Sequence, residues 1–400
     1  MTVFAVTAVR AVLPDRVLDR ATVVVEDGLI AAVSERGAAP PNAVDGRGVF
    51  CLPGLVDTHS DGLEKELRPR PGVVLDNDFA LRSYEGRVRA AGVTTMFHGI
   101  GFENGEKYQR SVQLANDLCD AIERRASSPD AIVDHRILYR LDARDADGFV
   151  SLQERLARRV DDGALPLVSF EDHTPGQGQY TDRTGFERYI MGTQGLSADE
   201  ARRRVDELIG ERDQLLVNRA RALPWLTREA QRGRIRLMAH DPTTRDEVEE
   251  AVSWNAAIGE FPTTVEAARL ARERGLRTVC GAPNVLRGGS HSGNVSAVEL
   301  VALGLCDGLA SDYLPSTLLG AVAALVDTGV CALPDAVALV TSGPADTVGL
   351  HDRGRLVPGC RGDLVLASID RRLPTVRAVL RAADHQEDTW TSNRSPVLTT

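Results

Sequence analysis

Between residues 52 and 348 the chain alternates short apolar runs with longer charged stretches of helical character. A strand–helix alternation of this kind is typical of a parallel sheet whose faces are covered by helices. Eight runs favour a closed TIM-like (β/α)8 barrel over an open doubly wound sheet, and no G-x-G-x-x-G motif joins the first run to a helix. The predicted strands span residues 50–56, 93–98, 132–141, 165–170, 235–239, 257–261, 278–281 and 308–310.

The two ends of the chain differ from this middle part. Residues 1–51 contain three β-branched runs separated by turn residues, and residues 349–383 have the same strand-rich character. We expect the two ends to pair into one small β domain beside a barrel of residues 52–348. The Arg- and Glu-rich stretch 184–232 predicts helices outside the barrel, and the polar residues 384–400 predict a flexible tail.

The composition limits what the protein can bind. The net charge of −10 argues against non-specific binding to nucleic acid, which needs a basic surface. The longest apolar stretch, 318–340, contains Asp327 and Asp335 and predicts a buried helix rather than a membrane span. Arg10 and Asp15 interrupt the N-terminal apolar residues too early for a secretory signal, and the six cysteines include no C-x-x-C pair. We therefore expect a cytoplasmic protein that binds a small molecule, and we expect it to be a homo-oligomer.

Polar residues gather where the predicted strands end. In a barrel, catalytic residues lie at the carboxyl ends of the strands, and five of the eight histidines fall at or just after such ends. One histidine there would more often be a core or loop residue, but five accompanied by carboxylates indicate a divalent metal site. The histidines are His59, His98, His173, His240 and His291, and the carboxylates are Asp61, Asp142, Glu171, Asp172, Asp241, Glu260 and Asp312.

Asp312 follows the last predicted strand and is a candidate general base. A divalent metal lowers the pKa of a bound water to roughly 7, so a nearby carboxylate can accept the proton of that water at neutral pH. The alternative is structural, because Asp312 also precedes the helical pattern of residues 316–322 and could cap that helix.

Three loops carry groups suited to an anionic substrate. A Gly- and Ser-rich loop that runs into a helical pattern offers backbone N–H groups, and guanidinium forks match phosphate oxygens. Plain connectors and solvated surface loops are the structural alternatives. The candidate substrate ligands are Arg287, Ser290 and His291 in the loop 282–300, Lys65, Arg68 and Arg70 in the segment 61–73, and Gln177 and Gln179 in the loop 172–180.

Several stretches together resemble one family. They include "VDTHSDGLEKELRPRPGV", "SFEDHTPGQGQY", "AHDPTTRDEVEEA", "GAPNVLRGGSHSGNVSA" and "SDYLPSTLL", in order between residues 52 and 367. They resemble the amidohydrolase superfamily and, within it, the PhnM-type diphosphatases of the carbon–phosphorus lyase pathway. The resemblance implies a barrel with a composite β-sandwich from both chain ends. It also implies a metal-dependent hydrolase that cleaves α-D-ribose 1-methylphosphonate 5-triphosphate into pyrophosphate and 5-phosphoribosyl 1-methylphosphonate.

The resemblance further implies a cofactor of one or two divalent ions. We expect zinc, with manganese and iron as alternatives. Lys65 and Lys107 are the only lysines and neither follows a middle strand, so we expect no carbamylated lysine between two metals. The implied metal ligands are His59, Asp61, Asp142, His173, His240 and Asp312. The expected catalytic residues are Asp312 and His291. From charge and placement we assign substrate contacts to Lys65, Arg68, Arg70, His98, Gln177, Arg287, Ser290 and His291.

The chain also departs from the family pattern at strand ends. Leu138, His98 and Pro242 stand where the family usually carries His, Asp and Asp, and Asp142 replaces the usual Glu. A second interpretation is therefore a relative of the same fold that acts on a different phosphorylated or cyclic-amide substrate. A third is a non-catalytic binding subunit, although the retained metal-ligand positions argue against it.

Overall fold

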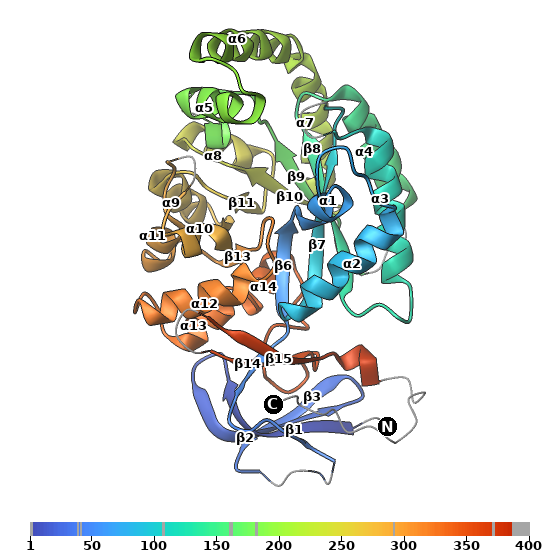
Figure 1. Cartoon of the computed structure of the whole chain (residues 1–400), viewed down its shortest axis with the longest axis vertical. Coiled ribbons are helices and arrows are strands. Elements are labelled where there is room, and N and C mark those ends of the chain that lie inside the picture. Colours follow the sequence, from blue (N-terminus) through green and yellow to red (C-terminus); the bar gives the residue numbers. More distant parts are fainter. Residues whose placement is uncertain are drawn as a thin grey trace. The chain divides into compact units, whose positions relative to one another are not determined.

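Eight parallel strands form a sheet in which hydrogen-bonded neighbours follow one another in chain order. An isolated parallel bridge between Ser60 and Asp312 joins the first strand to the residues after the last, so the sheet is a nearly closed barrel. The predicted (β/α)8 barrel is confirmed. Its strands, most of them labelled in Figure 1, are β6 (Leu55–Ser60), β7 (Val93–Phe102), β8 (Asp134–Asp142), β9 (Leu167–Glu171), β10 (Arg236–His240), β11 (Ile258–Glu260), β12 (Arg277–Gly281) and β13 (Gly308–Ala310).

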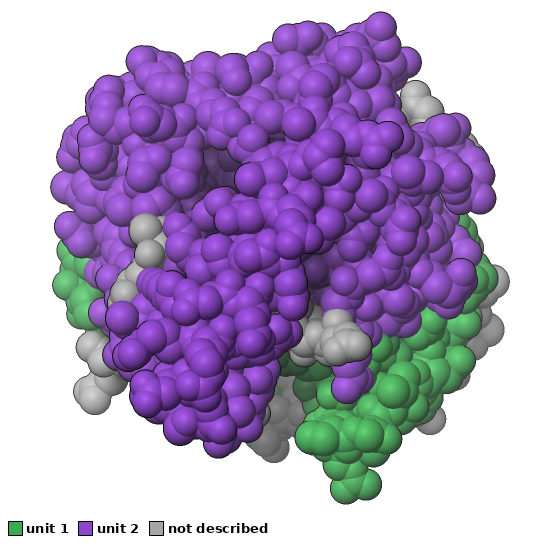
Figure 2. All heavy atoms as spheres, turned by 90° about the horizontal axis from the view of Figure 1, so that it is seen from above, with its two compact units in different colours: residues 1–97, 124–136, 308–400 green, residues 98–123, 137–307 purple. Residues whose placement is uncertain are grey.

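This computed structural model describes residues 3–37, 40, 42–105, 109–159, 163–180, 183–290, 293–369 and 373–385. The chain divides into two compact units, coloured separately in Figure 2. Unit 1 comprises residues 1–97, 124–136 and 308–400, and unit 2 comprises residues 98–123 and 137–307. Most of the tail predicted to be flexible, residues 386–400, lies outside the described residues.

A second sheet in unit 1 is built from both ends of the chain. Its order is β15-β14-β5-β1-β2-β3, with β4 paired to β1. The two ends meet where β14 pairs antiparallel with β5, with Leu366 opposite Cys51, and side chains such as Val6 and Val23 bury its core. The predicted β domain from both termini is confirmed. Its strands are β1 (Val3–Val12), β2 (Val17–Glu26), β3 (Leu29–Glu35), β4 (Val44–Asp45), β5 (Phe50–Pro53), β14 (Leu364–Ser368) and β15 (Thr375–Leu380).

The predicted strand 50–56 is two strands, β5 and β6, separated by Gly54. A Cβ at Gly54 would lie 2.2 Å from Thr94 Oγ1 and 2.9 Å from Asp363 Cβ, so only glycine leaves room for these neighbours. β5 belongs to the seven-stranded sheet and β6 to the barrel. The chain therefore changes sheets at a residue that the apolar pattern does not single out.

Helices follow the barrel strands, as the alternation in the sequence predicts. No helix of the described residues is long and apolar enough to cross a membrane. The apolar stretch 318–340 forms α12, which is buried along most of its length, and α13. The helices are α1 (Gly62–Leu67), α2 (Asn77–Ala90), α3 (Val112–Ala126), α4 (Ala146–Arg158), α5 (Arg183–Gln194), α6 (Ala198–Gln214), α7 (Leu216–Gln231), α8 (Arg245–Ser253), α9 (Val265–Glu273), α10 (Ala282–Arg287), α11 (Ala297–Ala302), α12 (Thr317–Asp327), α13 (Leu333–Ala338) and α14 (Ser342–Thr347), with 3-10 turns η1 (Gly178–Tyr180) and η2 (Ala382–His385).

Strand register in unit 2 places chemically important residues side by side. Asp142 pairs with Glu171 at the ends of β8 and β9, and His240 pairs with Glu260 at the ends of β10 and β11. Since parallel strands present their carboxyl ends at one rim, these side chains meet there. The register therefore creates a polar rim from residues up to 118 positions apart in the sequence.

The predicted helical stretch 184–232 is confirmed as α5, α6 and α7 in unit 2. α5 and α6 have a small core of their own, which includes Phe186, Ile190 and Val205. Ser197 and Glu200 form a capping box that starts α6, because each side chain binds the backbone N–H of the other residue. This helical insert carries Arg212, which binds Asp142 at the end of β8 and Asp172 after β9.

Candidate metal-binding clusters

In unit 1, His59, Asp61 and Asp312 form a cluster of candidate metal ligands. One ligand atom of each lies within 4.8 Å of the others, and His59 Nε2 is 3.4 Å from Asp61 Oδ1. His59 lies in β6, Asp61 follows that strand and Asp312 follows β13. The structure thus brings together three residues that the sequence analysis selected as ligands.

The backbone at Asp312 is held in an uncommon conformation. Its φ is 58°, in the left-handed region that residues other than glycine rarely adopt. The Asp312 N–H donates to the His59 carbonyl at 3.0 Å, and the Asp61 N–H donates to the Asp312 carbonyl. α12 has Ser316, not Asp312, at its N-cap. The alternative role of Asp312 as a helix cap is therefore wrong.

Asp57, which the sequence analysis did not select, supports this cluster from within β6. Its Oδ1 accepts hydrogen bonds from the Ser311 N–H at 3.0 Å and from the His59 N–H at 3.3 Å. Burial raises the pKa of Asp57 to about 6. Asp57 therefore links the two strand ends that carry His59 and Asp312. A carboxylate inside an apolar run was the signal in the sequence.

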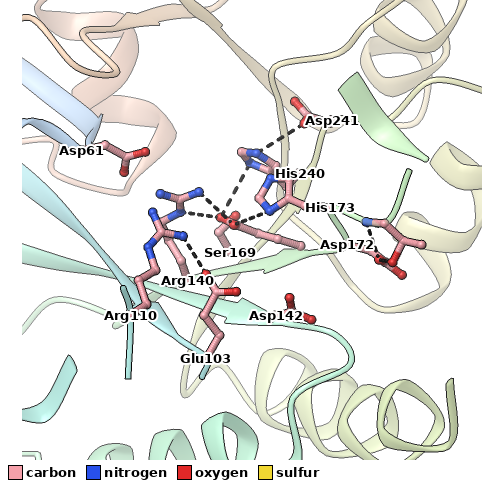
Figure 3. Close-up of polar contacts among 12 residues, drawn as sticks. Asp61, Glu103, Arg110, Arg140, Asp142, Ser169, Asp172, His173, His240 and Asp241 are labelled. Carbon is pink, nitrogen blue, oxygen red and sulfur yellow. Dashed lines mark hydrogen bonds and ion pairs between the residues drawn. The ribbon is translucent and has the colours of Figure 1, made fainter. Parts of the chain in front are cut away.

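In unit 2, Glu171, His173 and His240 form a second cluster, and Figure 3 shows the two histidines side by side. One ligand atom of each lies within 4.8 Å of the others. The Nδ1 atom of each histidine is 3.8 Å from a Glu171 oxygen, and the two rings meet edge to face with centroids 5.2 Å apart. Glu171 and His240 end β9 and β10, whereas His173 lies in the loop after β9.

Arg140 holds the Glu171 carboxylate through two hydrogen bonds. They measure 2.7 Å from Nε to Oε1 and 3.0 Å from a terminal nitrogen to Oε2. Burial alone would raise the pKa of Glu171, but Arg140, His240 and His173 together lower it to about 2. Burial also lowers the pKa of His173 to about 3. At neutral pH both groups are thus in the ionisation state that a metal ligand requires.

His240 lies among carboxylates. Its Nδ1 is 2.7 Å from Glu260 Oε2, which also accepts a hydrogen bond from the Ser169 hydroxyl at 2.8 Å. Its Nε2 is 3.4 Å from Asp241 Oδ2. Burial alone would lower the pKa of His240, but Asp241, Glu171 and Glu260 raise it to about 9. These surroundings favour positive charge at this position, which a divalent cation would supply.

Asp142 belongs to none of the ligand clusters that the described residues form. Its carboxylate accepts two hydrogen bonds from Arg212, at 2.9 and 3.0 Å, and one from the Arg144 N–H at 2.8 Å. Burial raises the pKa of Asp142 to about 6, although Arg212 opposes this effect. The structure thus places Asp142 in a buried ion pair, where the sequence analysis expected a metal ligand.

Three candidate substrate ligands lie in unit 1, in or just after α1. Lys65 and Arg70 are exposed, and Arg68 is half-buried. The Lys65 ammonium lies 4.1 Å from the centroid of the Tyr313 ring, a cation–π contact. Because Tyr313 follows Asp312 in the chain, this contact places Lys65 near the Asp312 end of the first cluster.

The candidate substrate ligands of unit 2 differ in exposure. Gln177 and Arg287 are exposed, and Ser290 is half-buried. The Gln177 amide nitrogen donates to Asp172 Oδ2 at 3.2 Å, and its oxygen accepts from Arg144 Nη2 at 2.9 Å. Arg287 is the last residue of α10. The side chain of Gln179 and all of His291 lie outside the described residues.

His98 is not at the end of its strand, and that prediction was wrong. β7 continues to Phe102, and the His98 side chain is fully buried within it. The strand extends because the apolar alternation resumes at Ile100 after His98. A single polar residue in such a run does not mark the strand end.

Several residues that shape the unit 2 cluster were not predicted as ligands or as their partners. Glu171 and Glu260 were recognised at strand ends but were not selected as ligands. Arg140 is a charge inside the apolar run of β8, which is itself a signal of a buried ion pair. Arg212 gave no signal, because charged residues are normal on a helix such as α6.

Comparison with known proteins identifies the family. A relative from Escherichia coli (strain K12), an alpha-D-ribose 1-methylphosphonate 5-triphosphate diphosphatase, is 35% identical over 349 residues, which cover 86% of this chain and 89% of the relative. The chain belongs to the family of this diphosphatase. It is a hydrolase. No protein-family model matches the chain.

Several solved structures share the fold of this chain. An amidohydrolase has a TM-score of 0.58 at 18% identity, with 96% of this chain and 98% of the other covered. An Xaa-Pro dipeptidase with bound methionine has a TM-score of 0.63 at 13% identity, covering 96% and 99%. An enamidase of the amidohydrolase superfamily has a TM-score of 0.56 at 13% identity, covering 96% and 95%. At these identities the likeness shows the fold alone.

Proposed function

We propose that the protein is a metal-dependent diphosphatase that hydrolyses α-D-ribose 1-methylphosphonate 5-triphosphate to pyrophosphate and 5-phosphoribosyl 1-methylphosphonate. The similarity to the Escherichia coli diphosphatase over most of both chains carries this proposal. The ligand clusters support it, because a phosphoric anhydride is commonly cleaved with the help of divalent cations. The proposed site of action is the cytoplasm.

The residues present fit a divalent metal. His59, Asp61 and Asp312 combine one imidazole with two carboxylates, and Glu171, His173 and His240 combine two imidazoles with one carboxylate. Such nitrogen and oxygen donors suit zinc, manganese or iron, and we propose zinc, with one or two ions per chain. A bound cation would supply a water of lowered pKa and a positive charge beside the phosphate oxygens.

The side chains around a bound substrate would then have distinct roles. Asp312 accepts a proton from the attacking water. The water oxygen bonds to the α-phosphorus, and the bond from the α-phosphorus to the departing pyrophosphate breaks. Cationic and hydroxyl groups stabilise the charge on the triphosphate oxygens. We propose Lys65, Arg68 and Arg70 in unit 1, and Gln177, Arg287 and Ser290 in unit 2, as substrate contacts. We propose His291 as a further catalytic group.

A cavity in unit 2 favours a second candidate function. It measures about 70 Å³ and lies beside Glu171 and His240. Because most of the charged side chains in its wall are acidic, it would repel a triphosphate. This favours a related hydrolase that acts on a neutral or cationic substrate, such as a cyclic amide. The charged residues of the wall beyond these two are Asp172, Asp241, Glu247, Glu250 and Arg219.

The test is pyrophosphate release from the ribose triphosphate by protein reconstituted with zinc or with manganese. ATP is the comparison substrate, because it shares the triphosphate but not the anomeric phosphonate. We expect rapid release with a strong preference over ATP, loss of activity with a chelator, and recovery on metal return. Folded, metal-loaded protein that releases no pyrophosphate would overturn the diphosphatase, and turnover of a cyclic amide would then support the second candidate.

A further inference from the structure

Arg212 of the helical insert reaches the loop that carries His173. Its Nε donates to Thr174 Oγ1 at 2.9 Å, and a terminal nitrogen donates to Asp172 Oδ1 at 3.2 Å. The guanidinium thus binds the residue before His173 and the residue after it. Its side chain is about four-fifths buried, with 19% exposed, so these bonds are shielded from solvent.

We propose that Arg212 is a positioning residue that sets the place of His173 in the unit 2 cluster. This inference rests on the metal-binding role proposed for His173. Glu171 and His240 end regular strands, and direct hydrogen bonds hold their side chains. His173 lies in a loop, and its Nδ1 is 3.8 Å from Glu171, which is too far for a hydrogen bond.

The other two hydrogen bonds of Arg212 go to Asp142 at the end of β8. Asp142 is the register partner of Glu171, so the guanidinium joins the end of β8 to the loop that follows the neighbouring strand β9. Without this cation, the carboxylates of Asp142 and Asp172 would lose the guanidinium nitrogen that they share. Asp142 therefore acts as the fixed end of this link rather than as a metal ligand.

The chemistry of this link requires an arginine. Three acceptor groups, Asp142, Asp172 and Thr174, bind one planar guanidinium at three of its nitrogens. A lysine ammonium is a point charge and cannot bind two carboxylates and a hydroxyl in this planar arrangement. The geometry thus predicts that Arg212→Lys does not hold the loop in place, even though the substitution keeps the positive charge.

Arg144 ties the same insert to the same loop. Its Nε donates to Asp172 Oδ2 at 2.8 Å and its Nη1 donates to Asp213 Oδ1 at 3.0 Å. The Asn218 amide of α7 donates to the Arg144 carbonyl at 2.9 Å. The insert therefore contacts the loop through two arginines, and Arg212 is the one that also binds Thr174.

The experiment measures zinc affinity by chelator competition, together with the visible spectrum of the cobalt-substituted protein. Mutation of a residue that orients a metal ligand typically weakens metal affinity about 10- to 100-fold. We expect Arg212→Gln and Arg212→Lys to weaken binding of the ion at His173 by at least about tenfold and to change the cobalt spectrum. Thr174→Val, a milder change that keeps both carboxylates, should weaken it less.

Arg204→Gln is the matched control. Arg204 lies on the same helix, but it is exposed, and its ion pairs within the described part of the chain are with Glu207 and Glu211 of that helix. It should leave the affinity and the spectrum unchanged. Thermal unfolding of each variant separates loss of positioning from loss of the fold.

Asp142→Asn separates the link from direct ligation. If Asp142 is the fixed end of the link, Asp142→Asn and Arg212→Gln weaken zinc binding alike, and the double variant is no weaker than either. Unchanged zinc affinity and cobalt spectrum in folded Arg212→Gln would overturn the proposal, as would loss of an ion in Asp142→Asn alone. Because no substrate is used, failure of the diphosphatase assay would leave this test intact.

Discussion

At the scale of single residues, Asp312 combines an uncommon backbone conformation with the proposed roles of metal ligand and proton acceptor. Its left-handed φ of 58° and its two backbone hydrogen bonds place its carboxylate beside the side chains of His59 and Asp61. Non-glycine residues in this region cost about 1–3 kcal/mol and persist where the surrounding structure holds them. Asp241 and Phe261, which follow strands β10 and β11, share this conformation.

We predict that Asp312→Asn reduces pyrophosphate release by about 10²- to 10⁴-fold. The amide keeps the shape of the side chain but cannot accept a proton. The measurement is turnover of zinc-loaded protein, with thermal unfolding as a check of the fold. Asp15→Asn is the control, because Asp15 is exposed and binds Arg16. Near-normal turnover in Asp312→Asn would contradict the assigned role.

At the scale of elements, the sheet change at Gly54 is the most restrictive feature of unit 1. The chain enters the barrel two residues after leaving the seven-stranded sheet, and Thr94 and Asp363 crowd the turn from two sides. A hydrophobic run cannot reveal such a turn, because Pro53 and Leu55 on either side of Gly54 are apolar and every residue of β5 and β6 is buried.

We predict that Gly54→Ala destabilises the protein by about 1–3 kcal/mol, because the new methyl group would overlap Thr94 Oγ1. Gly86→Ala is the matched control in the same unit. Gly86 lies in α2 with open space around it, so alanine there should stabilise the helix by up to about 1 kcal/mol. Denaturant unfolding measures both changes. Equal effects of the two substitutions would contradict the steric argument.

At the scale of the whole molecule, buried ion pairs join segments that are far apart in the chain. Glu85 of α2 binds Arg125 at 2.7 and 2.9 Å, His135 at 2.9 Å and the Ile132 N–H at 2.8 Å. Burial alone would raise the pKa of Glu85, but these partners lower it from 4.5 to about 2. The folded carboxylate thus holds its charge to lower pH than the unfolded one.

This shift predicts an acid-dependent loss of stability. Because the folded pKa lies below the unfolded value, the contribution is complete above about pH 4.5 and is lost as the pH falls towards about 2. Glu85→Gln should cost about 3 kcal/mol at neutral pH, since it leaves Arg125 buried without its charge partner.

The measurement is the free energy of unfolding of both proteins between pH 7 and pH 3. The difference between wild type and Glu85→Gln should narrow on acidification. Glu35→Gln, at an exposed position of β3, is the control and should show almost no difference. A gap that stays constant down to pH 3 would contradict the assigned pKa shift.

The sequence by itself determined the barrel, the composite β domain and the types of ligand. Apolar runs of strand length alternate with helices, and this local periodicity depends only on neighbours in the chain. The same applies to His59, His173, His240 and Asp312, because the carboxyl ends of barrel strands converge wherever the strands pair in order. A sequence pattern was therefore sufficient to select them.

Only the tertiary structure decided which charges meet. Whether Asp142 faces a metal or an arginine depends on where α6 ends, and Arg212 is 70 residues away in the chain. Glu171 entered a ligand cluster, and His98 became a buried strand residue, through strand register and strand length rather than residue type. The physical reason is that periodicity records which residues are buried, whereas the pairing of buried charges depends on distances between segments that folding alone brings together.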